Sequence, residues 1–221
     1  MFRSLVVLLC ATGALVQMQV EARAEESSFA KAGTLTLSSG FSFSTDSGDF
    51  RIKGDATQFD LPDSSDMSLF VGIGAFVVDG LMLKIEIGVG YDTQDDIEAQ
   101  TESVQFSYGI AFEPSYYIAL DQERRLHALI YARLGYSGAN TEADNFKLAT
   151  FDETTRGGIS YGAGVGLALS LGTDLGAFVQ LTLGYLGRSY TTELNWSDLP
   201  RTEAETERGG LQSLLTVGAY F

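Results

Sequence analysis

The sequence is nearly without cysteine, histidine, tryptophan and proline. Its 221 residues include 1 Cys, 1 His, 1 Trp and 3 Pro. The one cysteine, Cys10, falls in a segment that we expect to be removed, so disulfides and thiol chemistry are excluded as a basis for the fold. Because the bulky Leu9 precedes Cys10, we also reject a lipidation site there. The few prolines, beside Gly 25 and Tyr 10, favour strands and tight turns.

Long apolar runs are missing as well, and so is positive charge. A membrane-spanning helix needs about 20 apolar residues, and the apolar run near the start covers only residues 5–16. That run follows Arg3 and precedes an A-x-A pattern at residues 22–24, which predicts a secretory signal peptide over residues 1–24. Residues 25–221 then form one domain. The formal net charge of -15 argues against a nucleic-acid partner, since phosphate binding needs a basic surface.

What the sequence does have is an alternation of apolar residues with small or polar ones. Eight stretches show it, at residues 33–44, 67–78, 81–91, 104–119, 126–137, 158–171, 175–190 and 210–221. In the sixth stretch the positions of one parity are apolar or aromatic, and those between them are glycine, serine or alanine. A period of two predicts β-strands, here with one lipid-like face.

The connections between these strands alternate between short and long. The short ones are residues 79–80, 121–125 and 172–174, and the long ones are residues 45–66, 92–103, 138–157 and 191–209. We therefore predict an all-β fold, an eight-stranded antiparallel up-and-down transmembrane β-barrel with short periplasmic turns and long extracellular loops. The alternative is a soluble sandwich or a lipocalin-type barrel, whose apolar faces would point inward.

Charge placement favours the membrane barrel over the soluble alternative. The apolar faces of the predicted strands carry no charged residue, and the charged strand residues fall on the opposite faces: Lys84, Glu86, Glu113, Arg133 and Arg188. Those opposite faces are otherwise mostly glycine, serine, alanine and threonine. A face of small residues suits the narrow interior of an eight-stranded barrel better than a solvated exterior.

Aromatic residues add an independent indication of a bilayer. Rings collect at the two membrane interfaces of outer-membrane barrels. One predicted girdle lies near the long-loop ends of the strands and consists of Phe43, Tyr91, Phe106, Tyr108, Tyr136, Tyr161 and Tyr185. Tyr116 and Phe221 would form a thinner belt at the opposite rim.

The last strand carries a resemblance to a known family. Leu215, Val217 and Phe221 place apolar residues at every second position before a terminal aromatic residue. Together with the architecture of residues 33–221, this resembles the small eight-stranded outer-membrane proteins of the OmpA-transmembrane and OmpX-like kind. The resemblance implies that these three residues form an assembly signal for the outer-membrane assembly machinery. Ala219 departs from the pattern, because a larger or aromatic residue is common there.

The charged interior residues predict a network in the lumen. Counting from the predicted loops places Lys84 opposite Ala111 and diagonal to Glu113, with Glu113 near Arg133 and with Glu86 in the same network. We interpret the network as a polar plug, because a buried charge without a partner costs several kcal/mol. The other interpretation is a gated or selective pore.

The sequence offers little for catalysis. The single histidine, His127, is expected on the polar face near Tyr117 at the periplasmic end, and we interpret it as structural. The G-x-G-x-G run at residues 162–166 lacks the helix and spacing of a nucleotide site, so no cofactor is expected. We therefore predict a non-enzymatic structural or surface-interaction protein. A narrow pore or small-molecule passage is the alternative, and a lipid A modifying enzyme comes third.

The long connections are acidic and contain a few exposed aromatic candidates. Acidic residues gather at Asp92, Asp95, Asp96, Glu98, Glu102, Glu203, Glu205 and Glu207. They lack the ordered spacing of a calcium-binding loop, so we expect no dedicated metal site. We expect a solvated surface that meets outer-membrane lipid and lipopolysaccharide, with divalent ions bridging to its phosphates. Trp196, Phe50 and Phe59 would pack within the loops or form an adhesive tip for an unknown extracellular ligand.

Overall fold

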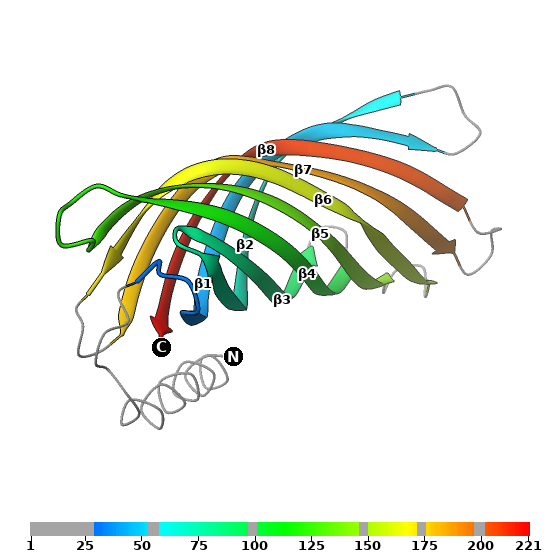
Figure 1. The fold of residues 1–221 in the computed structure, drawn as a ribbon. Coiled ribbons are helices and arrows are strands. Elements are labelled where there is room, and N and C mark those ends of the chain that lie inside the picture. Colours follow the sequence, from blue (N-terminus) through cyan, green and yellow to red (C-terminus); the bar gives the residue numbers. More distant parts are fainter. Residues whose placement is uncertain (1–28, 53–57, 97–100, 146–149, 172–175, 197–201) are drawn as a thin grey trace.

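The barrel predicted from the alternation is present in a computed structural model, which describes residues 29–52, 58–96, 101–145, 150–171, 176–196 and 202–221. Eight strands form one closed antiparallel barrel in the order of the chain (Figure 1). They are β1 (Leu35–Ile52), β2 (Gln58–Val78), β3 (Leu81–Asp96), β4 (Thr101–Ala119), β5 (Leu126–Asn145), β6 (Thr150–Ser170), β7 (Ala177–Trp196) and β8 (Thr202–Tyr220). These ranges contain no helix long and apolar enough to cross a bilayer. The predicted signal peptide lies outside the described residues.

The two faces of each strand follow the predicted parity. On β3, Ile85 and Ile87 are more than half exposed on the outside, whereas Lys84 and Glu86, which alternate with them, are buried. The same parity governs β8, where Gln212 and Thr216 are buried and Leu211 is exposed. Apolar side chains therefore cover the outside of the barrel, and buried polar side chains lie inside it, as in a membrane barrel and opposite to a lipocalin.

The strands are longer than the sequence analysis predicted, and the predicted long loops are largely strand. β1 continues from the predicted end at residue 44 to Ile52, and its partner β2 begins at Gln58, which pairs with Arg51. The strands contain 16 to 21 residues, whereas about 9 to 11 suffice to cross a bilayer. Antiparallel hydrogen bonding needs no apolar side chains, so the ladders continue beyond the apolar segments. The same correction applies to residues 92–103, 138–157 and 191–209.

The segment before β1 folds back into the barrel mouth that holds the short turns. The amide of Gly33 donates to the carbonyl oxygen of Phe76, at 2.8 Å, and the amide of Gly80 donates to that of Ala30, also at 2.8 Å. The Ala32 amide donates to Asp79 Oδ1 at 2.9 Å. This segment is therefore tied to the β2–β3 turn, although no period in the sequence marks it.

The ladder between β2 and β3 is shorter than the others. Its described pairs run from Val78 opposite Leu81 to Leu69 opposite Val89 and end there. Beyond this point β2 stays paired with β1 as far as Gln58, and β3 stays paired with β4 as far as Asp96. The two hairpins diverge in Figure 1, and we call the interval between them the β2–β3 seam.

Candidate functional site: the barrel interior

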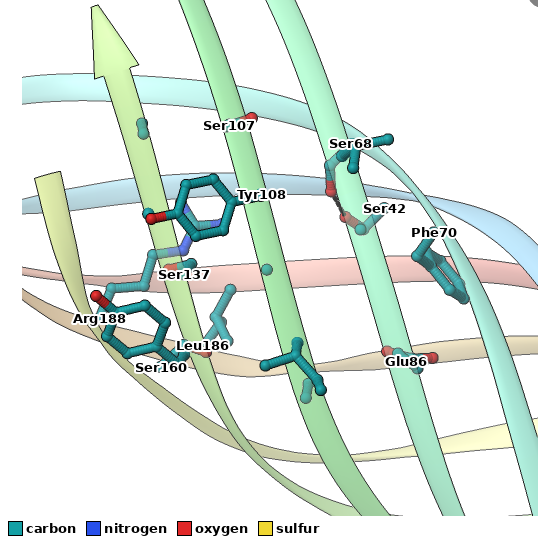
Figure 2. A pocket seen from close by; sticks show the side chains of 18 of the residues that line it. Ser42, Ser68, Phe70, Glu86, Ser107, Tyr108, Ser137, Ser160, Leu186 and Arg188 are labelled. Atoms are coloured by element: carbon teal, nitrogen blue, oxygen red, sulfur yellow. Dashed lines mark hydrogen bonds between the residues drawn. The ribbon is translucent and has the colours of Figure 1, made fainter. Parts of the chain in front are cut away.

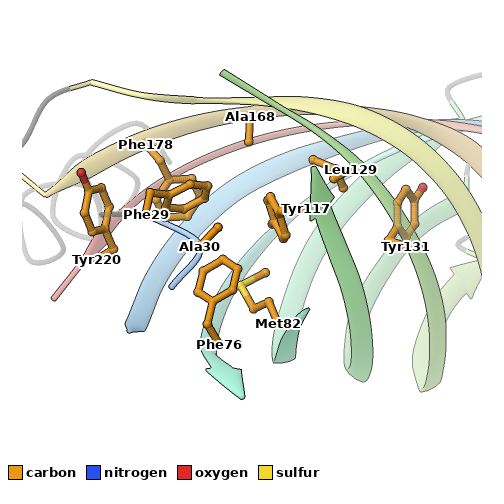
Figure 3. Close-up of a cluster of buried hydrophobic side chains, with 10 residues drawn as sticks. All are labelled: Phe29, Ala30, Phe76, Met82, Tyr117, Leu129, Tyr131, Ala168, Phe178 and Tyr220. Carbon is orange, nitrogen blue, oxygen red and sulfur yellow. The ribbon is translucent and has the colours of Figure 1, made fainter. Parts of the chain in front are cut away.

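The end of the lumen near the short turns is filled by apolar side chains. We call this group the aromatic plug; it comprises Phe29, Ala30, Phe76, Met82, Tyr117, Leu129, Tyr131, Ala168, Phe178 and Tyr220 (Figure 3). Phe29 is 2% exposed. Its ring centroid lies 5.1 to 5.5 Å from those of Phe76, Tyr117, His127, Phe178 and Tyr220. The pre-barrel segment thus supplies the residue around which the plug packs.

Two phenol groups of the plug are hydrogen-bonded to buried polar side chains beside it. Tyr117 Oη donates to Gln180 Oε1 at 2.7 Å, and the hydroxyl oxygens of Ser170 and Tyr220 lie 2.8 Å apart. Buried phenols need such partners, so these contacts fix the ring orientations. His127 is buried against Phe29 and 6.4 Å from Tyr117 between ring centroids, in the place that its strand position predicted.

Above the plug, the structure brings together all four charged residues of the predicted lumen network. Lys84 Nζ lies 2.8 Å from Glu86 Oε1 and 2.6 Å from Glu113 Oε1. Arg133 Nη1 bonds Glu86 Oε2 and lies 3.5 Å from Glu113 Oε2. Lys84, Glu86 and Glu113 are each at most 2% exposed. Two cations and two anions therefore balance inside the barrel.

The register within this network differs from the prediction by two residues. Lys84 lies directly opposite Glu113, and it is Glu86 that lies opposite Ala111. The prediction assumed a loop over residues 92–103, whereas strand pairing continues to Asp96 opposite Thr101. The connection is therefore centred one residue later in the chain than the loop at residues 92–103 implies, and this shifts every pair of the ladder by two residues, because register follows from the turn.

A second ion pair spans the lumen farther from the plug. Arg188 Nη1 donates to Asp46 Oδ2 at 2.9 Å, and Arg188 Nη2 donates to Ser44 Oγ at 3.2 Å. Arg188 lies on the inner face as its position in the sequence predicts, whereas Asp46 falls within the loop predicted over residues 45–66. Asp46 reaches Arg188 because β1 continues past residue 44.

Between the two charge layers lies a cavity of about 250 Å³. Glu86 and Arg133 of the lumen network line it together with Arg188, so charged groups border it from both layers. In Figure 2, Ser137, Ser160 and Arg188 lie on one side of the cavity and Ser42, Ser68 and Phe70 on the other. The hydroxyl oxygens of Ser42 and Ser68 are 2.7 Å apart. Hydroxyl and guanidinium groups therefore line the cavity together with apolar side chains such as Phe70 and Leu186.

Comparison with known proteins assigns the chain to a family. Residues 6–203 match the family described as outer membrane protein beta-barrel domain. The chain belongs to this family. A search of curated proteins finds no match.

Solved structures support the same fold at low sequence identity. The outer membrane protein OprG from Pseudomonas aeruginosa has a TM-score of 0.56 and 13% identity, with 86% of this chain and 97% of OprG covered. A major outer membrane protein from Thermus thermophilus has a TM-score of 0.51 and 12% identity, with 83% and 99% covered. The outer membrane protease OmpT from Escherichia coli reaches a TM-score of 0.46 at 7% identity, with 90% and 100% covered. The first two similarities show the barrel fold.

The predicted girdle residues of this outer-membrane barrel lie on its outside. Most of them are 42% to 53% exposed: Phe43, Phe106, Tyr108, Tyr136, Tyr161, Tyr185, Tyr116 and Phe221. Four of the tyrosine rings lie over a glycine of the next strand, in the pairs Tyr108–Gly138, Tyr136–Gly157, Tyr161–Gly187 and Tyr185–Gly209. A ring that covers a bare backbone replaces the missing side-chain contact of the glycine. The side chains of Tyr91, Phe50, Phe59 and Trp196 lie outside the described ones.

The three residues of the predicted assembly signal follow the outer face of β8. Val217 and Phe221 are almost half exposed, and Leu215 is less exposed. Phe221 is joined to the first strand in both directions, because the Leu35 amide donates to its carbonyl oxygen at 2.9 Å and its own amide donates to Leu35 at 3.1 Å. The backbone of Phe221 thus helps to close the barrel.

The acidic surface is described only in part. Glu203, Glu205 and Glu207 are exposed on the outer face of β8, whereas the side chains of Asp92, Asp95, Asp96, Glu98 and Glu102 lie outside the described ones. Within the described residues, no three His, Cys, Asp or Glu side chains are grouped as a metal site would require.

Proposed function

We propose that this outer-membrane barrel is a non-enzymatic structural or surface-interaction protein whose lumen does not conduct. The observation that carries the proposal is the lumen network, in which Lys84 contacts both Glu86 and Glu113 while all three are nearly inaccessible. A conducting pore needs a wet path that ions can enter and leave. Charges that are neutralised by one another at less than 3 Å favour a plug over such a path.

The aromatic plug supports the same proposal from a second layer. Phe29 closes the interior below Lys84 with contacts to rings from β2, β4, β5, β7 and β8. An ion entering from this side would have to cross an apolar layer before reaching the network. Two unlike barriers in series explain why eight strands, which enclose little space, suffice for closure.

The extended strand ends suggest where interaction with a partner would occur. β1 and β8 remain paired from Thr36 and Tyr220 to Ile52 and Ala204, far longer than a bilayer requires. The barrel would anchor this sheet at the cell surface. Its exposed acidic residues, such as Glu205 and Glu207, would repel free phosphate and accept divalent ions that bridge to lipopolysaccharide.

Planar-bilayer recording tests the proposal. We expect the purified protein to give no stable conductance, and we expect Arg133→Ala to lower its stability more than it raises conductance. A large, stable conductance from the unaltered protein would favour the narrow pore. Mass analysis of lipid A tests the enzymatic alternative. It compares cells without the protein, cells with the unaltered protein and cells with His127→Ala. An enzyme would change the mass of lipid A only in cells that contain the protein.

A further inference from the structure

We infer that the β2–β3 seam and the cavity behind it form a binding site for a single-chain amphiphile with one anionic headgroup, of the long-chain carboxylate class. The headgroup would enter the cavity through the seam, and the alkyl chain would stay outside along β2 and β3. This inference does not depend on whether the lumen conducts.

The cavity and the seam are continuous. The last residues paired across the seam, Leu69 and Val89, both line the cavity, and so do Met67 and Ser68 just beyond them. Met67 is 78% exposed, as expected for a side chain on an unpartnered strand edge. All the other neighbouring strands of the barrel remain paired well above this level. The seam is thus the lateral entrance that the described wall offers.

The seam begins at the level of the outward aromatic band. Val89 pairs with Tyr108, and Met67 pairs with Phe43. Both aromatic partners belong to the outward band that the sequence predicts at the outer interface, where lipid headgroups lie. Below this level the wall is apolar, with Leu69, Val71, Ile87 and Val89 all at least 39% exposed. A molecule with its head at the seam would therefore have its chain in hydrocarbon.

The cavity wall carries more cationic than acidic side chains. Among its lining residues, Arg133, Arg156 and Arg188 are cationic and Glu86 is acidic. Arg133 bonds Glu86, and Arg188 bonds Asp46. Arg156 is an exposed residue that continues the inner-face positions of β6 opposite the buried residues Ala139 and Thr192, and no carboxylate of the described side chains forms an ion pair with it. One monoanion would balance Arg156 in a chain that is otherwise strongly acidic.

The volume sets the division between head and tail. A dry cavity of about 150 Å³ holds a benzene-sized molecule, so 250 Å³ accommodates a carboxylate with a few methylene groups but not a long chain. The serine hydroxyls around the cavity supply donors to the carboxylate, and the remaining methylene groups gain burial only against the outer wall. A long-chain carboxylate can use both the cavity, with its headgroup, and the apolar outer wall, with its chain. A soluble anion can use only the cavity.

Electron paramagnetic resonance of spin-labelled stearic acid tests this site. The full barrel is placed in phosphatidylcholine nanodiscs with stearic acid that carries a nitroxide near its methyl end, and with the corresponding methyl ester. We expect a motionally restricted spectral component that saturates at one acid per barrel. The acid should bind about tenfold more tightly than the ester, which is the effect of one charge-assisted hydrogen bond. Unlabelled palmitate should displace the label, and butyrate should not.

Arg156→Gln should remove the preference, so that the acid binds no more tightly than the ester. Arg124→Gln removes an exposed arginine at the opposite end of the barrel and should leave the preference for the acid unchanged. Equal restriction of acid and ester, or an unchanged preference in Arg156→Gln, overturns the inference. Displacement by butyrate overturns the role of the chain and points to a soluble anion.

A reversible crosslink tests the entrance. Met67→Cys with Tyr91→Cys places cysteines at the next positions of the interrupted ladder, and the described residues contain no competing cysteine. Oxidation should remove the restricted component and reduction should restore it. Ile73→Cys with Ile85→Cys, at positions already paired, is the control that should change nothing. A crosslinked seam that still admits the acid overturns the lateral entrance; if the crosslink fails to form, the comparison of the two arginine variants decides.

Discussion

Lys84 and Glu113 face each other directly across β3 and β4, and their charged atoms are 2.6 Å apart in a part of the lumen that is closed to solvent. Glu113 and Glu86 share this one lysine with Arg133 on the other side. Because each carboxylate touches both cations, removing one cation affects two ion pairs at once. The network therefore responds to single substitutions as a unit.

Replacing Lys84 with methionine should destabilise the barrel by about 3–5 kcal/mol, because it leaves two buried carboxylates with one cation. The measurement is urea unfolding in detergent. The folded fraction at each urea concentration is the fraction that keeps the gel mobility of the unheated barrel. Lys31→Met changes the same charge at an exposed position and should stay within about 0.5 kcal/mol of the unaltered protein. Equal stabilities of the two variants would contradict a tightly coupled network.

Replacing Phe29 with alanine should cost about 3–5 kcal/mol, because it empties the centre of the aromatic plug. Phe41→Ala is the matched control: it removes the same atoms from an outward position that is 45% exposed, and its effect should be clearly smaller. Bilayer recordings of Phe29→Ala should remain silent, since the lumen network is untouched. Open channels in this variant would mean that the plug alone closes the barrel.

Replacing Gly187 with alanine should cost about 1–3 kcal/mol, because the new Cβ would lie 2.6 Å from the ring of Tyr161. In a Tyr161→Leu background the same substitution should cost much less, so that a double-mutant cycle yields a coupling energy. Gly109→Ala meets only ordinary contacts of 3.4 Å or more and serves as the control. Additive effects would show that the ring does not depend on the bare backbone.

Replacing Phe221 with alanine should slow assembly into the membrane severalfold while leaving the assembled barrel nearly as stable. The backbone bonds between Phe221 and Leu35 do not require the ring, whereas the proposed recognition by the assembly machinery does. Pulse-chase appearance of the heat-modifiable form measures the rate. Leu211→Ala, which shortens an outward residue of the same strand, should assemble at the normal rate; a loss of stability without slower assembly would instead assign the ring a structural role.

The period of two was enough to predict the eight strands and which of their faces lies inside, because bilayer and lumen impose opposite demands on neighbouring residues. The same parity assigns Lys84, Glu86, Glu113 and Arg133 to one network, although their exact pairing depends on where the β3–β4 turn is centred, and the predicted centre was one residue too early. The strand ends were underestimated because a ladder in water leaves no apolar trace.

Phe29 lay beyond reach of the sequence analysis for a different reason. A single aromatic residue before the first strand has no period, and its five ring contacts come from strands spread over the whole chain. The β2–β3 seam was equally hidden, since Ser68 and Gly90 look like any other inner-face positions and only the missing hydrogen bonds distinguish them. Alternation reports the environment of each residue but not which neighbour its backbone meets.

The pairing of β1 with β8 has a consequence for biogenesis. Leu37 finds its partner Ala219 only at the far end of the chain, whereas the other ladders join strands that are neighbours in sequence. Hairpins can thus form early and locally, but two open edges must persist until the ring shuts, and such edges invite wrong association. The yield of assembled protein in the outer membrane would then depend on how well those edges are shielded during transport. It would depend less on the strength of any one contact in the finished barrel.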